Sequence, residues 1–162
     1  MSYYWERSGF VDYNNTSGDF IVTADVWVDV TNDGLGAFSN SLYVPPGVTN
    51  LLDVSGGLIF SELNIGDAIF IRNDISITPS VNGAAVSFRY KLGTGAGEYY
   101  LPRYWGTLNY GAGFLTRFVE EDYIYMGDEN TRGNGATLQI NCTEDAIVNN
   151  AGCAIQIMRQ GK

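Results

Sequence analysis

Three consecutive carboxylates, Glu120, Glu121 and Asp122, are the residues of this sequence whose spacing most suggests acid–base chemistry. On a strand, Glu120 and Asp122 would share one face, and two like charges held close together raise the pKa of a carboxyl. A glycosidase uses such a pair, but it also needs a substrate cleft. Because charged side chains are mostly exposed, we favour the interpretation that all three lie on the solvated face of an outer strand.

The segment 29–34 (DVTNDG) resembles the first half of a calcium loop, with oxygen-bearing side chains at positions 1, 3 and 5 and glycine at position 6. The twelfth position is Asn40 instead of a bidentate glutamate, and Thr31 is a poor ligand at the third. An Asn-Asp-Gly cluster also ends strands without any metal. We therefore favour a turn from Asp29 to Asp33, with a loosely bound cation as the alternative, and we expect no cofactor.

The sequence contains no histidine, which removes the usual general base and every Ser-His-Asp or Cys-His arrangement. The loop 93–97 (GTGAG) lacks the Lys-Ser/Thr pair and the following helix of a phosphate-binding loop. Cys142 and Cys153 have the core-facing parity of two successive strands, and they would come within disulfide reach if those strands paired. A cytosolic origin favours two reduced, buried thiols instead. We expect no enzymatic activity.

Composition indicates one globular domain, since 45% of the 162 residues are apolar and only 17% are charged. The 18 acidic and 9 basic residues give a net charge of −9, which argues against nucleic acid or an anionic membrane as a partner. The N-terminus lacks the features of a secretory signal, and no apolar run approaches the ~20 residues of a membrane span. We therefore expect synthesis and folding in the cytosol.

The positions of these residues are set by strands, of which the clearest lie between residues 67 and 92. Ile69, Ile71, Ile75 and Ile77 share one parity, which is typical of a strand with one buried face. After the turn signal Asn82-Gly83, alternation resumes from 86 to 92, so the sequence predicts a hairpin.

Further strands are predicted along the rest of the chain. The alternation across 19–30 predicts one long strand, and shorter strands are expected at 37–44, 51–61, 98–105, 114–126, 136–142 and 153–157, with polar loops such as 127–135 between them. About eight to ten strands joined by turns indicate an all-β antiparallel sandwich. Long polar loops favour a jelly roll with very little helix, which we place at 19–162.

Exposed aromatic residues are the candidates for binding a partner. Residues 1–18 show no clear periodicity, and we predict an N-terminal arm that docks on its own domain or on a neighbour through Tyr3, Tyr4, Trp5 and Phe10. A second aromatic set suits a subunit interface, core filling or stacking on sugar rings, of which we favour the first two. It comprises Tyr99, Tyr100, Tyr104, Trp105 and Tyr110.

The strand pattern resembles the TNF/C1q-like trimeric jelly-roll domains of bacteriophage virion proteins. The resemblance covers about residues 20 to 160 and is carried by segments 67–79, 86–92, 123–128, Arg132 with 134–143, and 152–160. It comprises a Gly-Asp start, an Arg-x-Asp and an Ile-x-Pro within one strand, an Asn-Gly turn, and a final pair of alternating strands. The resemblance implies a homotrimer packed about a three-fold axis, without catalytic activity.

These observations lead to one function and two alternatives. We predict a non-enzymatic virion protein, assembled in the host cytoplasm, that decorates or cements a capsid as a trimer and contacts the major capsid protein or another virion protein. A tail-fibre tip that recognises a host-surface glycan or protein is the alternative, and saturable cell adsorption would favour it. A jelly-roll glycosidase would instead depend on Glu120 or Asp122.

Overall fold

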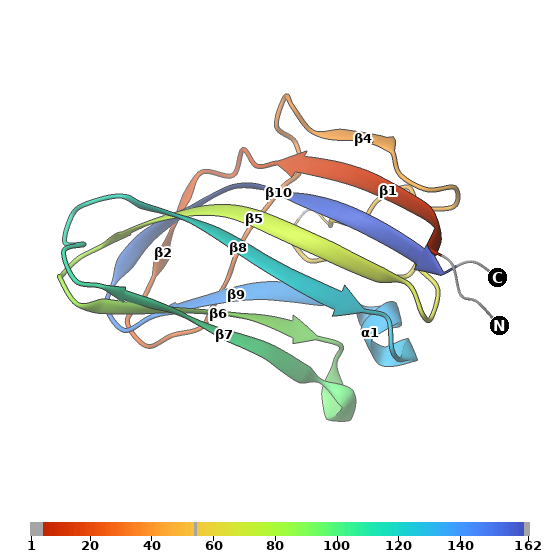
Figure 1. The fold of residues 1–162 in the computed structure, drawn as a ribbon. Coiled ribbons are helices and arrows are strands. Elements are labelled where there is room, and N and C mark those ends of the chain that lie inside the picture. The colour runs from red at the N-terminus through yellow and green to blue at the C-terminus, as the bar shows by residue number, and fades with distance from the viewer. Residues whose placement is uncertain (1–4, 54, 161–162) are drawn as a thin grey trace.

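The computed structural model describes residues 5–53 and 55–160, which form two antiparallel sheets packed face to face (Figure 1). One sheet has the strand order β4-β1-β10-β5-β8, with β2 also pairing with β10, and the other has the order β3-β9-β6-β7. The six-stranded sheet contains β1 (Trp5–Asn14), β2 (Asp19–Val22), β4 (Asn40–Tyr43), β5 (Ala68–Pro79), β8 (Thr116–Tyr125) and β10 (Ala146–Gln160). The four-stranded sheet contains β3 (Val28–Asp29), β6 (Ala84–Leu92), β7 (Tyr99–Leu108) and β9 (Ala136–Cys142). The predicted all-β jelly roll is therefore confirmed.

Alternation along β5 is also confirmed, because Ile69, Ile71, Ile75 and Ile77 are all buried. The predicted hairpin is wrong, however, since β5 and β6 belong to opposite sheets. The exposed turn after Pro79 carries the chain from one sheet to the other at the end of the sandwich, so the two strands bury their apolar faces toward each other. The edges of β5 are occupied by β10 and β8, and those of β6 by β9 and β7.

The long strand predicted for residues 19–30 is broken in two. β2 pairs with β10 in one sheet and β3 pairs with β9 in the other, so the chain changes sheets between them. Asp25 has a left-handed φ of 61° at this corner, and its N–H donates to the carbonyl oxygen of Cys142 at 2.8 Å. Apolar residues stay at the even-numbered positions without interruption through this change of sheet, because the even-numbered residues are turned inward both before and after it. The alternation therefore gave no sign that the strand is broken.

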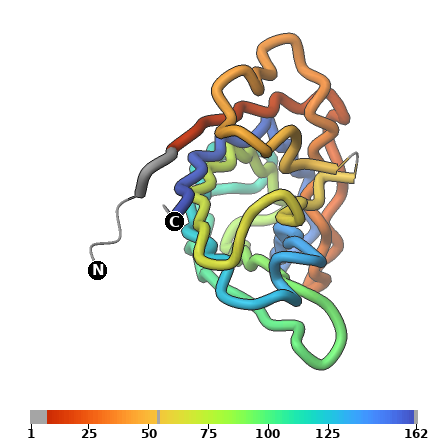
Figure 2. Tube along the Cα trace, turned by 90° about the vertical axis from the view of Figure 1, so that its right-hand side faces the viewer, coloured from red at the N-terminus to blue at the C-terminus, as the bar shows by residue number. Residues whose placement is uncertain are grey.

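Residues 5–14 of the predicted N-terminal arm form β1, between β10 and β4, so this part of the arm is a strand of the jelly roll. In Figure 2 β1 (red) and β10 (dark blue) run side by side, as their antiparallel pairing requires. Gly9 allows Pro45 to pack against β1, because a Cβ there would collide with the proline ring. Tyr3 and Tyr4 lie outside the described residues.

Two shorter segments differ from the sequence prediction. The predicted polar loop 127–135 contains a helix, α1 (Glu129–Asn134), whose first turn is capped by the Asp128 carboxylate accepting from the Thr131 N–H at 2.8 Å. The segment 51–61, predicted as a short strand with a turn or bulge at Gly56-Gly57, contains the turn but, among its described residues, only the isolated bridges Leu52↔Leu58 and Leu58↔Ala136 in place of a strand. A 3-10 turn, η1 (Gly95–Gly97), precedes β7.

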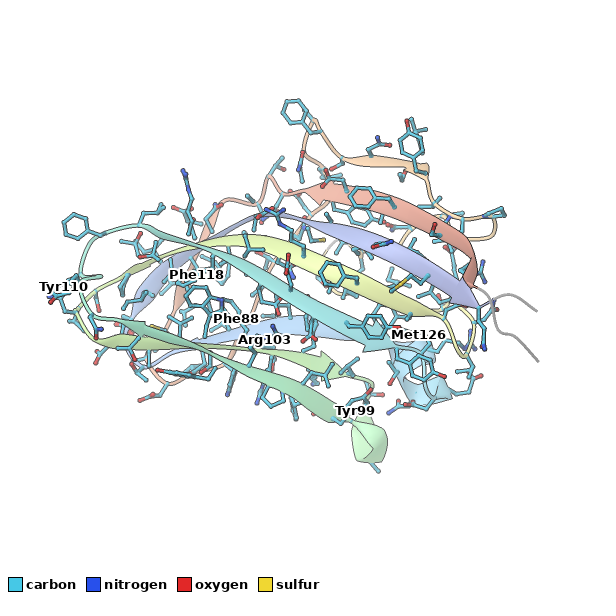
Figure 3. All side chains as sticks on the ribbon, in the orientation of Figure 1. Phe88, Tyr99, Arg103, Tyr110, Phe118 and Met126 are labelled. Carbon is cyan, nitrogen blue, oxygen red and sulfur yellow. The ribbon has the colours of Figure 1, made fainter. Side chains whose placement is uncertain are left out.

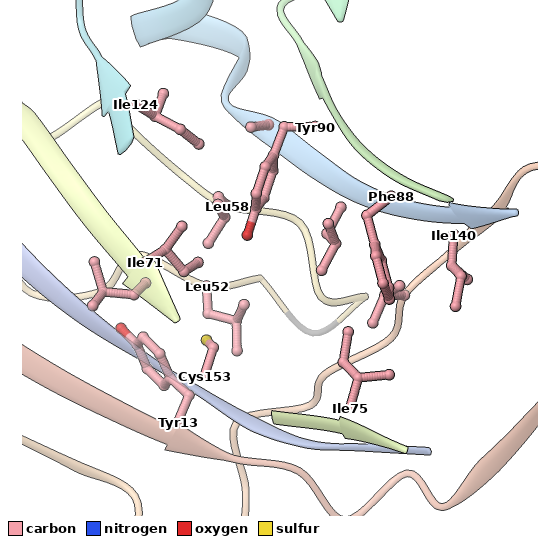
Figure 4. Packing of buried hydrophobic residues seen from close by; sticks show 14 of the residues in the cluster. Tyr13, Leu52, Leu58, Ile71, Ile75, Phe88, Tyr90, Ile124, Ile140 and Cys153 are labelled. Carbon is pink, nitrogen blue, oxygen red and sulfur yellow. The ribbon is translucent and has the colours of Figure 1, made fainter. Parts of the chain in front are cut away.

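The core lies between the two sheets and is apolar apart from a few buried polar groups (Figure 4). Tyr90 and Phe88 from the four-stranded sheet meet isoleucines of β5 across it. Cys142 and Cys153 are buried free thiols. Because β9 and β10 lie in different sheets, the cross-strand pairing considered for the two cysteines does not form.

Candidate functional site: an aromatic face and the edge beside it

A row of large side chains crosses the outer face of the six-stranded sheet. Strand register places Tyr43 beside Phe10, Phe10 beside Gln156, Gln156 beside Phe70, and Phe70 beside Tyr123. The four aromatic members are 37–68% exposed. We call these five residues the aromatic row. It spans β4, β1, β10, β5 and β8, and four of its five members are aromatic.

The surface next to the aromatic row is apolar on one side and charged on the other. On the apolar side the neighbouring register contains the half-buried Met158 and the exposed Tyr125, with the buried Ala68 between them. On the charged side it contains Arg72, whose guanidinium lies 2.8 Å from the Asp74 carboxylate. The row is therefore an apolar area bordered on one side by charged residues of the same sheet face, which is typical of a protein interface.

Of the residues predicted to bind a partner, Phe10 is a member of the aromatic row, and Trp5 lies on β1 at a backbone position paired with Gln160. Sequence reasoning missed Phe70, Tyr43 and Tyr123. A signal was present at Phe70, which has the outward parity of a strand whose other face contains four isoleucines.

The five residues predicted as a trimer interface do not form one surface. Tyr100 and Tyr104 face outward from the four-stranded sheet, since they pair with the outward positions of β6. Tyr110 is at the tip of the β7–β8 loop, at the end of the sandwich where Figure 3 labels it. Tyr99 lies at the opposite end of β7.

Trp105, which is 43% exposed, packs against the edge of the core. The register of β7 shifts between its pairings with Val86 and Ser87, which is a β-bulge. A bulge re-aims a side chain, and here the Trp105 ring contacts Phe118 edge-on, with centroids 4.2 Å apart. Trp105 thereby closes the open side of the sandwich, where β7 and β8 have no strand between them.

A polar contact closes the same edge further along. Arg103 on β7 lies 3.5 Å from Asp122 on β8, so an ion pair links the two edge strands.

On the outer face of the four-stranded sheet, the Arg89 guanidinium lies 4.1 Å from the ring centroids of both Trp27 and Tyr100. Because Arg89 occupies the face of the Tyr100 ring, that ring is engaged within the chain.

Glu120 corrects the interpretation of the three carboxylates as a solvated face. Its side chain is only 1% exposed, whereas Glu121 is exposed. Glu120 accepts hydrogen bonds from Asn73 Nδ2 at 2.9 Å and from the Tyr90 hydroxyl at 3.4 Å. Burial, opposed by the Asn73 hydrogen bond and assisted by the nearby charge of Asp122, raises the pKa of Glu120 to about 7.

This buried cluster links the two sheets but has no substrate cleft. Asn73 Nδ2 also donates to the Tyr90 hydroxyl at 2.7 Å, so three polar side chains satisfy one another within the core. Burial raises the pKa of Tyr90 well above its usual range. The interior cavity beside Asn73 and Tyr90 measures about 10 Å³, which is the space of a single water molecule.

The calcium-like segment is hydrogen-bonded within the protein. Asp29 accepts from the Gln139 amide at 2.7 Å, Asp33 accepts from the Leu35 N–H at 3.0 Å, and Asn32 is buried. Hydrogen bonds from Thr16 and from the Leu35 N–H lower the pKa of the exposed Asp33. Within residues 5–53 and 55–160, no three His, Cys, Asp or Glu side chains are grouped so that they could hold a metal ion.

Comparison with solved structures identifies the fold class as a TNF-like jelly roll. The Eiger TNF from S. frugiperda matches 96% of this chain and 92% of that chain, with 12% identity and a TM-score of 0.50. A weaker match is the PRD1 vertex protein P5, which matches 94% of this chain and 72% of that chain with 11% identity and a TM-score of 0.44. VP2 of infectious bursal disease virus matches 95% of this chain and 33% of that chain, with 12% identity and a TM-score of 0.47. No family model and no curated protein matches the sequence. In the described part of the chain, no helix is long and apolar enough to cross a membrane.

Proposed function

We propose that this chain is a non-enzymatic structural protein of a virus particle, a capsid decoration protein that assembles as a homotrimer through the aromatic row. The observation that carries the trimer is the row itself. A contiguous area formed by Phe10, Tyr43, Phe70 and Tyr123 is unfavourable in water, and aromatic residues are enriched where protein surfaces meet. Because the row crosses five strands, it offers a broad face, as obligate interfaces of roughly 2,000 Å² or more require.

The virion location is supported by the resemblance of the strand pattern to bacteriophage jelly-roll domains, together with the TNF-like fold. The absence of histidine from the sequence supports a structural role over a catalytic one. In this proposal the partners are further copies of the chain and a major capsid protein or another virion protein. Assembly takes place in the host cytoplasm.

Light scattering coupled to size exclusion tests the trimer. The wild-type protein should elute with the mass of three chains, and Phe70→Asp should elute as a single folded chain because it places a charge within the interface. Tyr104→Asp is the matched control, since Tyr104 is an exposed aromatic residue of the other sheet. A monomeric wild type at micromolar concentration would overturn the trimer. If Tyr104→Asp dissociates the trimer and Phe70→Asp does not, the interface lies on the four-stranded sheet, among the aromatic residues predicted from the sequence.

Electron microscopy of particles assembled with and without this chain tests the decoration role. We expect three-fold density on the outside of the shell that disappears when the chain is omitted. Saturable adsorption of the isolated trimer to host cells, with no density on the shell, would favour a tail-fibre tip instead.

A further inference from the structure

A second apolar area lies on the same outer sheet face, at the end away from the aromatic row. Ile147 on β10 pairs with Ile21 on β2 and with Thr78 on β5, and the two isoleucines are 51% and 71% exposed. Between Ile147 and Gln156 β10 runs nine residues, about 30 Å at the rise of a strand, so the two areas are separate. This end is the one on the left in Figure 1, where the β7–β8 loop turns.

The isoleucines line a groove of about 310 Å³. Its walls come from four segments that meet at this end of the sandwich. The lining residues are Ile21, Thr78, Pro79, Ser80, Gly113, Asp145, Ala146 and Ile147.

Hydrogen bonds between loops fix the shape of this groove. The Gly113 N–H donates to the Pro79 carbonyl at 2.9 Å, which holds the β7–β8 loop against the end of β5. The Ser80 N–H donates to the Asp145 carbonyl at 2.8 Å, and the Asp145 carboxylate accepts from the Ala24 N–H at 2.8 Å. The groove is therefore preformed, so a ligand would not have to order these loops when it binds.

The surroundings of the groove are acidic. The segments 19–27, 77–83, 109–115 and 143–149 contain the carboxylates of Asp19, Asp25, Glu144 and Asp145, of which Asp145 lines the groove. The exposed Arg117, opposite Ser76 in the adjoining register, is a single cation beside these four carboxylates. An apolar groove with an acidic rim is complementary to an apolar side chain flanked by cations.

We propose that this groove binds an extended segment of a partner protein in which an aliphatic or aromatic side chain is flanked by Lys or Arg. The apolar side chain lies against Ile21 and Ile147, and the basic side chains approach Glu144 and Asp19. The proposal does not depend on the trimer, since the aromatic row and the groove share no residue.

Selection from a displayed library of random dodecapeptides tests the proposal. Peptides recovered on the wild-type protein should contain an apolar core flanked by Lys or Arg. A synthetic copy of a recovered peptide should bind Ile147→Ser at least tenfold more weakly by fluorescence polarisation. Glu144→Gln should weaken binding severalfold and reduce its dependence on salt. Phe38→Ser, which removes an exposed aromatic side chain elsewhere, is the matched control and should bind as the wild type does.

Three results would overturn the proposal. They are the recovery of no peptide, recovered peptides without basic residues, and equal binding to wild type and Ile147→Ser. A change in oligomeric mass caused by Ile147→Ser, without a change in peptide binding, would assign the groove to contacts between copies. Loss of the trimer in Phe70→Asp with peptide binding retained would separate this site from the aromatic row.

Discussion

Asn73 on β5 and Glu120 on β8 are direct cross-strand neighbours, and Asn73 Nδ2 donates to Glu120 Oε2 at 2.9 Å inside the core. The Tyr90 hydroxyl reaches the same carboxyl oxygen from the opposite sheet. Most buried carboxyls lie beside a cation, whereas here the Arg103 guanidinium pairs with Asp122 at the edge and only moderates the pKa of Glu120. The protonation of the Glu120 carboxyl group is therefore coupled to the stability of the folded protein.

Stability should fall as the pH rises through neutrality. The folded pKa of Glu120, about 7, lies above its ordinary value of 4.5, so the folded state binds this proton more tightly than the unfolded state does. The resulting stabilisation is present in full below the unfolded pKa and is lost as the pH rises through the folded one, about 3 kcal/mol in all, of which about 2 kcal/mol is lost between pH 5.5 and pH 8.5. Urea unfolding at pH 5.5, 7.0 and 8.5 measures it.

Glu120→Gln should abolish most of this decrease, because the amide cannot ionise, and the variant should be more stable than the wild type at pH 8.5. Glu121→Gln is the matched control on the adjacent, exposed position and should retain the wild-type pH dependence. Equal wild-type stability at pH 5.5 and 8.5 would contradict the coupling.

Removing Asn73 should cost more stability while Glu120 is present than when it is absent. Asn73→Leu deprives the buried carboxyl of its main donor, so we expect a loss of about 1–3 kcal/mol that is larger at pH 8.5 than at pH 5.5. In a Glu120→Met background the same substitution should cost less and show no such pH dependence, because only the Tyr90 hydroxyl then loses a hydrogen bond. A double-mutant cycle by urea unfolding gives the coupling energy, and strictly additive effects would show that the two side chains act independently.

Trp105→Ala should loosen the open edge of the sandwich. The substitution removes the edge-on contact with Phe118, and we expect a loss of about 1–2 kcal/mol. Tyr104→Ala, which removes the neighbouring ring on the outer face, should change stability by less than about 0.5 kcal/mol. Thermal unfolding followed by circular dichroism compares the two variants, and equal losses would rule out a special role for the bulge.

Gly9→Ala should disturb the strand that carries Phe10. A Cβ at position 9 would collide with Pro45 and lie 2.8 Å from the Tyr43 carbonyl oxygen, so we expect a loss of about 1–3 kcal/mol. Gly133→Ala is the control, because a Cβ in α1 meets no atom within 4 Å and should be neutral or stabilise the helix. Denaturant unfolding measures both, and an undisturbed Gly9→Ala would show that the 45–47 segment yields freely.

The two thiols should be unreactive in the folded protein. Burial raises the pKa of Cys153 to about 12 and also raises that of Cys142. Ellman's reagent should therefore detect no thiol under native conditions at pH 8 and two in urea, because the thiolate is the reactive form. Rapid native labelling of either cysteine, or fewer than two thiols after unfolding, would contradict this.

The sequence predicted what depends on local alternation and failed where distant strands meet. Ile69 and Ile71 were correctly placed in the core because period two needs no partner to be recognised. Glu120 was misplaced because its donors lie 47 and 30 residues away, at Asn73 and Tyr90. Asn73 nevertheless occupies one of the inward-facing positions of β5, and a polar side chain at such a position indicates that another buried polar group hydrogen-bonds to it.

The aromatic row was missed because the sequence does not show how neighbouring strands are aligned. Whether Phe70 stands beside Tyr123 depends on how β5 and β8 are aligned, and a shift of one residue would turn one of them inward. The predicted hairpin failed similarly, because the turn signal at Asn82-Gly83 suits a change of sheet as well as a pairing of neighbours. A broken strand at Asp25 has no local signal, since alternation continues through it.

The central position of β10 determines when this chain is able to fold. Its backbone pairs with β1, β2 and β5, so half of the six-stranded sheet depends on residues 146–160. A nascent chain has made β1 and β5 long before these residues leave the ribosome, and until then one edge of each strand lacks its hydrogen-bonded neighbour. Sheet closure must therefore follow synthesis of residue 160, and the unpaired strands are exposed to aggregation in the meantime.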